Sequence, residues 1–322
     1  MSAGQMSVQE VINCVTDAFL ERFPGRVLAI YSTGSYSGEY AVAGSDLDLA
    51  LIFSGEVAET ERKQGAHLVE ELSDLVSLEL DLVLLGEVEE IRPALKFDST
   101  LVQGTDVRDR LRVMSTAYWI RERMYGGGWL ICHLFGRRGV AEIPITFPSA
   151  SGEFFGYNTD RGGAVSGPEG STKDLVRATS WAATAIVGQK SGGYVTSKAH
   201  LQSKLRDHLP QEWASFIEVL FTFCRRQTSY GIPKDANGRK KLRELCSRTR
   251  EFEDYFLNAY REFLLDELVA DVERTSEALE RIEETPFQDE AIRYKITSTD
   301  WRKIGLAKVG EKALLATERC YC

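Results

Sequence analysis

Two runs of residues decide the fold of this chain: Tyr31-Ser32-Thr33-Gly34-Ser35-Tyr36-Ser37-Gly38 and, seven residues later, Asp46-Leu47-Asp48-Leu49-Ala50-Leu51-Ile52-Phe53. The first run is the end of an apolar segment that enters a small-residue turn, and the second carries two carboxylates. Residues two apart on a strand point to the same face, so Asp46 and Asp48 would lie together. Two acids are costly to bury unpaired among apolar residues, which predicts a bound cation.

The composition describes an acidic chain with enough apolar residues for a large core. It has 322 residues, of which 43% are hydrophobic, and a net charge of -9. This charge favours a cationic or metal-shielded partner over nucleic acid. The six cysteines show no metal-ligand spacing and are typical of reduced thiols, and no signal peptide or membrane span is recognisable. We therefore expect a cytoplasmic protein without a membrane partner.

The first half of the chain alternates between helical and strand patterns. Ser7 and Glu10 form a capping-box pattern before apolar residues at helical spacing. A third apolar run carries Glu79 and Asp81, again in alternate positions. Glycines 126–128 are expected in a flexible turn, and residues 136–139 in a hairpin connection. The expected elements are helices over 7–23, 56–74 and 106–124, and strands over 26–32, 47–53, 77–85, 129–135 and 140–147.

The second half of the sequence has a pattern that predicts mainly helices. Residues 148–170 are rich in Gly, Ser, Pro and Asn, which is typical of a domain boundary. Segment 282–322 has a mixed pattern that predicts no particular element. Helices are expected over 171–190, 196–209, 211–230 and 240–281.

Three acids on neighbouring strands suit a pair of divalent metals with oxygen ligands, most simply Mg²⁺ bound to a nucleoside triphosphate. The Gly34-Ser35 turn would supply backbone N–H groups and a hydroxyl to the outer phosphates. Together these features describe nucleotidyl transfer, in which an acceptor hydroxyl attacks the α-phosphorus and pyrophosphate leaves. Asp81 would accept the hydroxyl proton.

The combination of Gly34-Ser35, Ser45-Asp46-Leu47-Asp48 and a third acid on a later strand resembles the motif of the DNA polymerase β-type nucleotidyltransferase superfamily. The resemblance implies that Asp46, Asp48 and Asp81 bind two Mg²⁺ ions and act in catalysis, and that Gly34, Ser35 and Ser45 contact the nucleotide. Asp81 fits the family's setting of an acid between apolar residues better than Glu79, whose part in catalysis stays open. The alternative is that Asp46 and Asp48 mark only an exposed strand or turn.

The stretch Ser191-Gly192-Gly193-Tyr194-Val195-Thr196-Ser197-Lys198, after a helix of small residues, resembles the helical domain of aminoglycoside adenylyltransferases of the streptomycin/spectinomycin type. That resemblance implies that Lys198 reaches into an interdomain cleft and contacts the triphosphate; the alternative is a solvated lysine at a helix start. The resemblance implies an α+β fold, with an N-terminal nucleotidyltransferase domain of mixed sheet and helices over residues 1–160 and a C-terminal α-helical bundle over 161–322. Those enzymes use a glutamate where this chain has Asp81, so the acceptor stays open.

We therefore expect a nucleotidyltransferase that moves a nucleoside monophosphate such as AMP from ATP or another triphosphate to a hydroxyl of a small molecule such as an aminoglycoside, as in antibiotic resistance. One alternative is transfer to tRNA or protein, as in toxin/antitoxin pairs, and another is a non-catalytic nucleotide-binding module. The tRNA alternative depends on the basic run over 239–250, which is more often a solvated helix face. The aromatic residues of 154–157 suit either base stacking or packing between domains.

Overall fold

The computed structural model describes residues 6–38, 41–76, 78–159, 169–301 and 305–319. The chain divides into two compact units. The first contains the described residues up to Trp119 together with Gly193–Lys204, and the second contains those from Ile120 to Gly192 and from Leu205 onward. The boundary expected between residues 160 and 161 lies outside the described residues.

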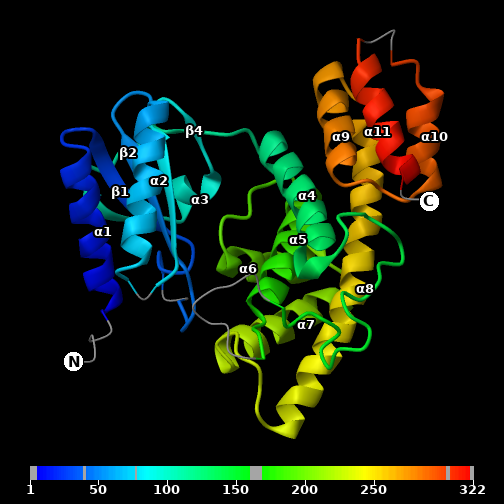
Figure 1. Ribbon diagram of the computed structural model, residues 1–322, viewed down its shortest axis with the longest axis horizontal. Helices are drawn as coiled ribbons and strands as arrows, with labels where there is room; N and C mark the ends of the chain where they lie inside the picture. The colour runs from blue at the N-terminus through cyan, green and yellow to red at the C-terminus, as the bar shows by residue number, and fades with distance from the viewer. Residues whose placement is uncertain (1–5, 39–40, 77, 160–168, 302–304, 320–322) are drawn as a thin grey trace. The chain divides into compact units, whose positions relative to one another are not determined.

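The first unit is built on a four-stranded mixed sheet with the strand order β3-β2-β1-β5. In Figure 1 the strands of this unit are drawn in blue and cyan. β2 is antiparallel to β1 and parallel to β3, while β5 is antiparallel to β1. The strands are β1 (Val27–Thr33), β2 (Leu47–Phe53), β3 (Leu80–Gly86) and β5 (Thr100–Gly104). The sequence pattern predicted β2 at its observed bounds and β1 to within one residue at each end.

Each face of this sheet has its own apolar core. Every second residue of β2, starting with Leu47, packs with helices α1 (Val8–Arg22) and α2 (Glu59–Ser73). Ala50 and Ile52 belong to a second cluster on the opposite face. The period of two along the strand produces this division, and it assigns Asp48 to the same face as Ala50 and Ile52.

Short elements complete the first unit. The capping box before α1 is confirmed, because the Ser7 hydroxyl accepts from the Glu10 N–H and the Glu10 carboxylate accepts from the Ser7 N–H. The predicted helix over 106–124 is wrong in its first part, where a short strand precedes the helix that begins at Thr116. These elements are β4 (Glu90–Ile91), α3 (Pro93–Phe97), a 3₁₀ turn (Arg108–Arg110) and β6 (Arg112–Val113).

The rest of the chain is largely helical, as expected for an α+β fold with a helical C-terminal region. The predicted helix over 240–281 is interrupted, and Asp271 caps the second part by accepting from the Arg274 N–H. Among the described residues no helix is both long and apolar enough to cross a membrane. The helices are α4 (Thr116–His133), α5 (Lys173–Ser191), α6 (Lys198–His208), α7 (Gln211–Leu220), α8 (Ala236–Glu267), α9 (Val272–Glu284), α10 (Glu290–Ser298) and α11 (Ala307–Arg319), with a 3₁₀ turn at Leu134–Gly136 and a π-helical segment at Phe221–Gln227.

The strands predicted over 129–135 and 140–147 are wrong, and so is the turn at glycines 126–128. All three glycines lie inside α4, and from 140 to 147 only Ala141 takes part in a β-bridge. A Cβ on Gly127 would lie 2.8 Å from the ring of Phe256, and one on Gly128 would lie 2.5 Å from the ring of Tyr260. The glycines therefore let α4 approach α8 closely, and this packing outweighs their low helix propensity of about 1 kcal/mol each.

The basic run on α8 contacts the loop 137–157 of the same unit. Arg239 forms ion pairs with Glu153 and Glu169. The guanidinium of Arg243 lies 4.3 Å from the ring centroid of Phe155. Such stacking of guanidinium groups on aromatic rings is favourable in itself. Arg239 is half-buried by these contacts, whereas Arg243 is exposed, as expected for a solvated face. The aromatic residues of 154–157 pack within one unit.

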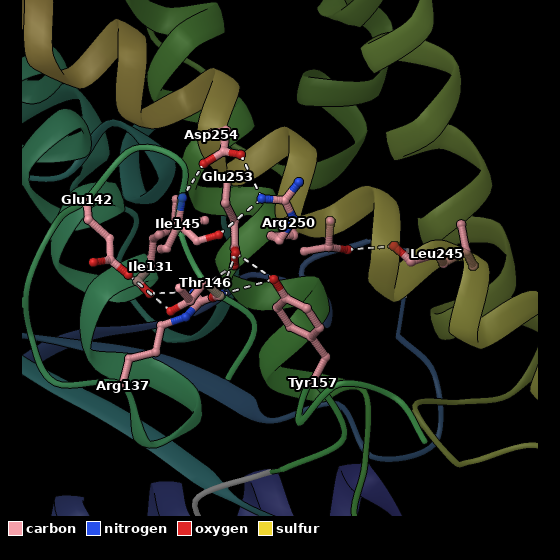
Figure 2. Close-up of polar contacts among 11 residues, drawn as sticks. Ile131, Arg137, Glu142, Ile145, Thr146, Tyr157, Leu245, Arg250, Glu253 and Asp254 are labelled. Carbon is pink, nitrogen blue, oxygen red and sulfur yellow. Dashed lines mark hydrogen bonds and ion pairs between the residues drawn. The ribbon is translucent and has the colours of Figure 1, made fainter. Parts of the chain in front are cut away.

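A buried ion pair anchors this loop to α8, as Figure 2 shows. The Arg137 guanidinium donates to the Glu253 carboxylate at 2.7 Å, and the Tyr157 hydroxyl donates to the same oxygen at 2.6 Å. The Arg137 and Glu253 side chains are only 7% and 3% exposed. Burial raises the pKa of the Tyr157 hydroxyl, so it stays a donor at all ordinary pH values.

Breaking this pair should cost far more than breaking an exposed one. We expect Glu253→Ala to lower the free energy of unfolding by about 3–5 kcal/mol, because Arg137 would stay buried without its partner. The control is Glu218→Ala, which removes the partner of Arg206 from a pair that is 64% and 32% exposed and should cost less than about 1 kcal/mol. Urea unfolding measures both, and equal losses would contradict the anchoring role.

Candidate active site

The turn that follows β1 lies directly beside Asp48. Thr33, the last residue of β1, is the Cα partner of Asp48 on β2. Gly34 has a φ of +66°, and a Cβ there would lie 2.0 Å from the Asp48 Oδ2 atom. Only glycine permits both this backbone conformation and this close approach of a carboxylate. Ser35 follows in the turn and is half-buried.

The register of β2 and β3 brings two acids together. Asp48 and Asp81 are Cα partners on these parallel strands, so their side chains leave the same face of the sheet about one strand spacing, ~4.8 Å, apart. Asp48 is half-buried, whereas Asp81 is exposed. Glu79 precedes β3, and its carbonyl accepts from the Leu47 N–H at 2.8 Å. The register therefore places Asp81, and not Glu79, next to Asp48.

Asp46 and Ser45 lie just before β2. The Ser45 hydroxyl accepts from the Val42 N–H at 3.1 Å and the Ser45 N–H donates to the Val42 carbonyl, so this buried serine closes the turn that leads into the strand. Burial, and to a smaller extent the Asp46 carboxylate, raise the pKa of the Tyr36 phenol. The turn closed by Ser45 and the first residue of β2, Leu47, therefore flank Asp46 on its two sides.

The first unit also contains Lys198, the first residue of α6, which is half-buried. Sequence reasoning missed the residues that hold this lysine's segment in place. Thr196 donates to Asp98, and the Tyr194 hydroxyl donates to the Met114 carbonyl. Thr196 and Asp98 are 98 positions apart in the chain, and Tyr194 and Met114 are 80 positions apart. No local sequence pattern predicts contacts between residues so distant.

The donor chemistry of this site fits magnesium. Among the residues that the structure describes, no group of three or more His, Cys, Asp or Glu side chains is already arranged to hold a metal ion. Magnesium, however, is usually bound by one or two carboxylates, with water and substrate phosphates as its other ligands. Asp48 and Asp81 supply such a pair, and two adjacent carboxylates repel each other unless a cation lies nearby.

One comparison with known proteins covers the region of the chain that contains this site. Residues 13–105 match the family model of the nucleotidyltransferase domain. The chain therefore contains a nucleotidyltransferase domain of the polymerase β type, and the matched region includes Gly34, Asp46, Asp48 and Asp81. A search of the curated proteins finds no match.

Two solved structures show weaker similarity. Spectinomycin adenyltransferase AAD(9) from Enterococcus faecialis, with ATP and spectinomycin, is 12% identical, with a TM-score of 0.48 over 78% of this chain and 100% of that chain. A mutant of the toxin-antitoxin MntA-HpeT is 20% identical, with a TM-score of 0.25 over 30% of this chain and 77% of that chain.

The close approach of Gly34 to Asp48 generates a test with a matched control. We expect Gly34→Ala to weaken binding of Mg²⁺ together with a non-hydrolysable ATP analogue by about tenfold or more, because the new Cβ would displace the carboxylate. Gly55→Ala has a similar φ of +68° but no atom within 4 Å of the new Cβ. It therefore introduces comparable backbone strain without moving an acid. Equal affinities of the two variants in calorimetry would refute this role of Gly34.

Proposed function

We propose that the protein transfers a nucleoside monophosphate, AMP for example, from a triphosphate to a hydroxyl of a small molecule such as an aminoglycoside, and releases pyrophosphate. The observation that carries this proposal is the pairing of Asp48 with Asp81 beside the Gly34 turn. This pairing lies within the region that matches the nucleotidyltransferase domain. An acid pair of this kind in a phosphate-binding setting suits phosphoryl chemistry.

In this mechanism Asp46, Asp48 and Asp81 would hold two Mg²⁺ ions. When bound, these ions would supply positive charge that stabilises the transition state. The acceptor oxygen forms a bond to the α-phosphorus, while the bond to the bridging oxygen breaks and its electron pair leaves with pyrophosphate. Asp81, the most exposed of the three acids, accepts the proton of the acceptor hydroxyl.

The remaining site residues bind the triphosphate. The backbone N–H groups of Gly34 and Ser35 and the hydroxyl of Ser35 face the outer phosphates in this proposal. Ser45 supports the turn that presents Asp46. Lys198 provides positive charge for the departing pyrophosphate, in the way that a fixed cation stabilises developing negative charge.

The acceptor is proposed to be a small cationic molecule because the chain carries a net charge of -9. Transfer to RNA has less support, since Arg239, Arg243 and Arg250 of the basic run contact the loop 137–157. The described cysteines are free thiols, which suits the cytoplasm, where ATP is available.

The catalytic role of the acids is tested by single substitutions. We expect Asp46→Asn, Asp48→Asn and Asp81→Asn each to reduce Mg²⁺-dependent pyrophosphate release by about 100-fold or more, since each removes a charged ligand or the proton acceptor. Asp74→Asn, at an exposed carboxylate that follows α2, is the control and should leave the rate unchanged. Unchanged release in the three site variants would refute the enzymatic proposal.

The acceptor is identified by following the label from α-labelled ATP. The wild-type protein is incubated with Mg²⁺ and, separately, with a panel of aminoglycosides, total tRNA and cell protein. We expect label on an aminoglycoside. Label on RNA or protein alone would contradict the small-molecule acceptor, and nucleotide binding without any transfer would favour a non-catalytic module.

A further inference from the structure

One short segment belongs to a different unit from the chain on either side of it. Residues Gly193–Lys204, here called the strap, are part of the first unit, whereas the described residues before and after them belong to the second. The strap includes Lys198 and the first turns of α6. Its contacts with the first unit therefore decide where this lysine is held.

The aromatic end of the strap is firmly packed. The Tyr194 ring meets the Trp119 ring edge-on at a centroid distance of 5.8 Å and lies 6.1 Å from the Phe97 ring. Its hydroxyl donates to the Met114 carbonyl at 2.5 Å, and the adjacent Val195 is only 5% exposed. These contacts hold the strap in place at Tyr194 and Val195, shortly before Lys198.

Thr196, two residues before Lys198, makes a polar contact with a distant part of the first unit. Its Oγ1 donates to the Asp98 Oδ2 at 2.6 Å, a short hydrogen bond to a charged acceptor. The His200 Nδ1 lies 3.1 Å from the same oxygen of Thr196. Burial lowers the pKa of His200, which keeps the ring neutral at physiological pH. Ser197 then accepts from the His200 N–H and so caps the helix that starts at Lys198.

The segment just after Asp98 is hydrogen-bonded to the turn that contains Gly34. Thr100, the first residue of β5, donates from its Oγ1 to the Ser37 carbonyl at 2.8 Å. The Ser37 hydroxyl in turn donates to the Gly34 carbonyl at 2.9 Å. Residues 98–100 are therefore hydrogen-bonded both to the strap and to the turn beside Asp48.

We propose that Asp98, Thr100 and Thr196 are positioning residues, which fix the strap that carries Lys198 and the Gly34 turn relative to one another. This inference rests on the proposed function, because it assigns both elements to the triphosphate site. A lysine side chain is long and flexible, so its charge is placed accurately only if its backbone is held. Small displacements of such groups reduce rates strongly, since catalysis depends on geometry.

The test begins with Thr196→Val, which keeps the shape of the side chain and removes the hydroxyl. We expect the KM for MgATP to rise about tenfold, the effect of losing one hydrogen bond to a charged group. Thr196→Ser should restore most of the affinity, because it returns the donor. The control is Ser203→Ala, which removes an exposed hydroxyl bonded to a backbone carbonyl on the same helix and should leave KM unchanged.

A double-substitution cycle separates positioning from general stability. If Thr196 acts through Lys198, then Thr196→Val should have almost no further effect on binding of an ATP analogue once Lys198→Met is present. Thr100→Val should weaken binding about tenfold even in the Lys198→Met background, because it acts through the Gly34 turn. Calorimetry with an analogue that has a methylene bridge between its α- and β-phosphorus measures these affinities without the reaction.

The outcomes distinguish this inference from the proposed function. If Lys198→Met and Asp48→Asn weaken binding or reaction while Thr196→Val and Thr100→Val behave like wild type, the positioning role is wrong and the proposed function stands. Full additivity of Thr196→Val and Lys198→Met would also overturn it. If Asp48→Asn leaves pyrophosphate release unchanged, the proposed function itself fails.

Discussion

The first unit depends on one constraint, the parallel register of β2 and β3, which sets Asp48 beside Asp81. Parallel neighbours need a crossover, and here α2 provides it. Gly65 in α2 permits close contact with the sheet, because a Cβ there would lie 2.7 Å from the Leu84 side chain on β3. Packing of the hydrophobic face thus sets the register, and the register places the Asp48 and Asp81 carboxylates together on the opposite face. Because these like charges repel each other, binding of a cation is favourable there.

Small residues permit close packing in the second unit as well. The glycines of α4 allow aromatic rings of α5 and α8 to pack against the helix backbone. Arginines of α8 then hold the loop 137–157 through ion pairs and ring contacts, and the Arg137–Glu253 pair is buried within this layer. Part of the basic run of α8 is therefore engaged in contacts within this unit, while Lys240 and Lys241 stay exposed.

Local pattern predicted much of the sheet and several helices. The alternation along Leu47–Phe53 and the capping box at Ser7 are local signals, and both are confirmed because burial on one face and an N-cap depend on nearby residues. The pattern failed for 129–147, where an apolar run with glycines begins inside a helix that is buried on several sides. Periodicity alone cannot separate a short apolar strand from a short apolar stretch at the end of a helix.

The sequence by itself determined the chemical character of the candidate site: the glycine turn, the acids two residues apart and the third acid are all visible in it. Only the tertiary structure decided which residues meet. The register selected Asp81 rather than Glu79 as the neighbour of Asp48, and the fold brought Thr196 to Asp98 across 98 positions. Strand register and long-range contacts follow from how whole faces pack, and a local pattern carries no information about partners so distant in the chain.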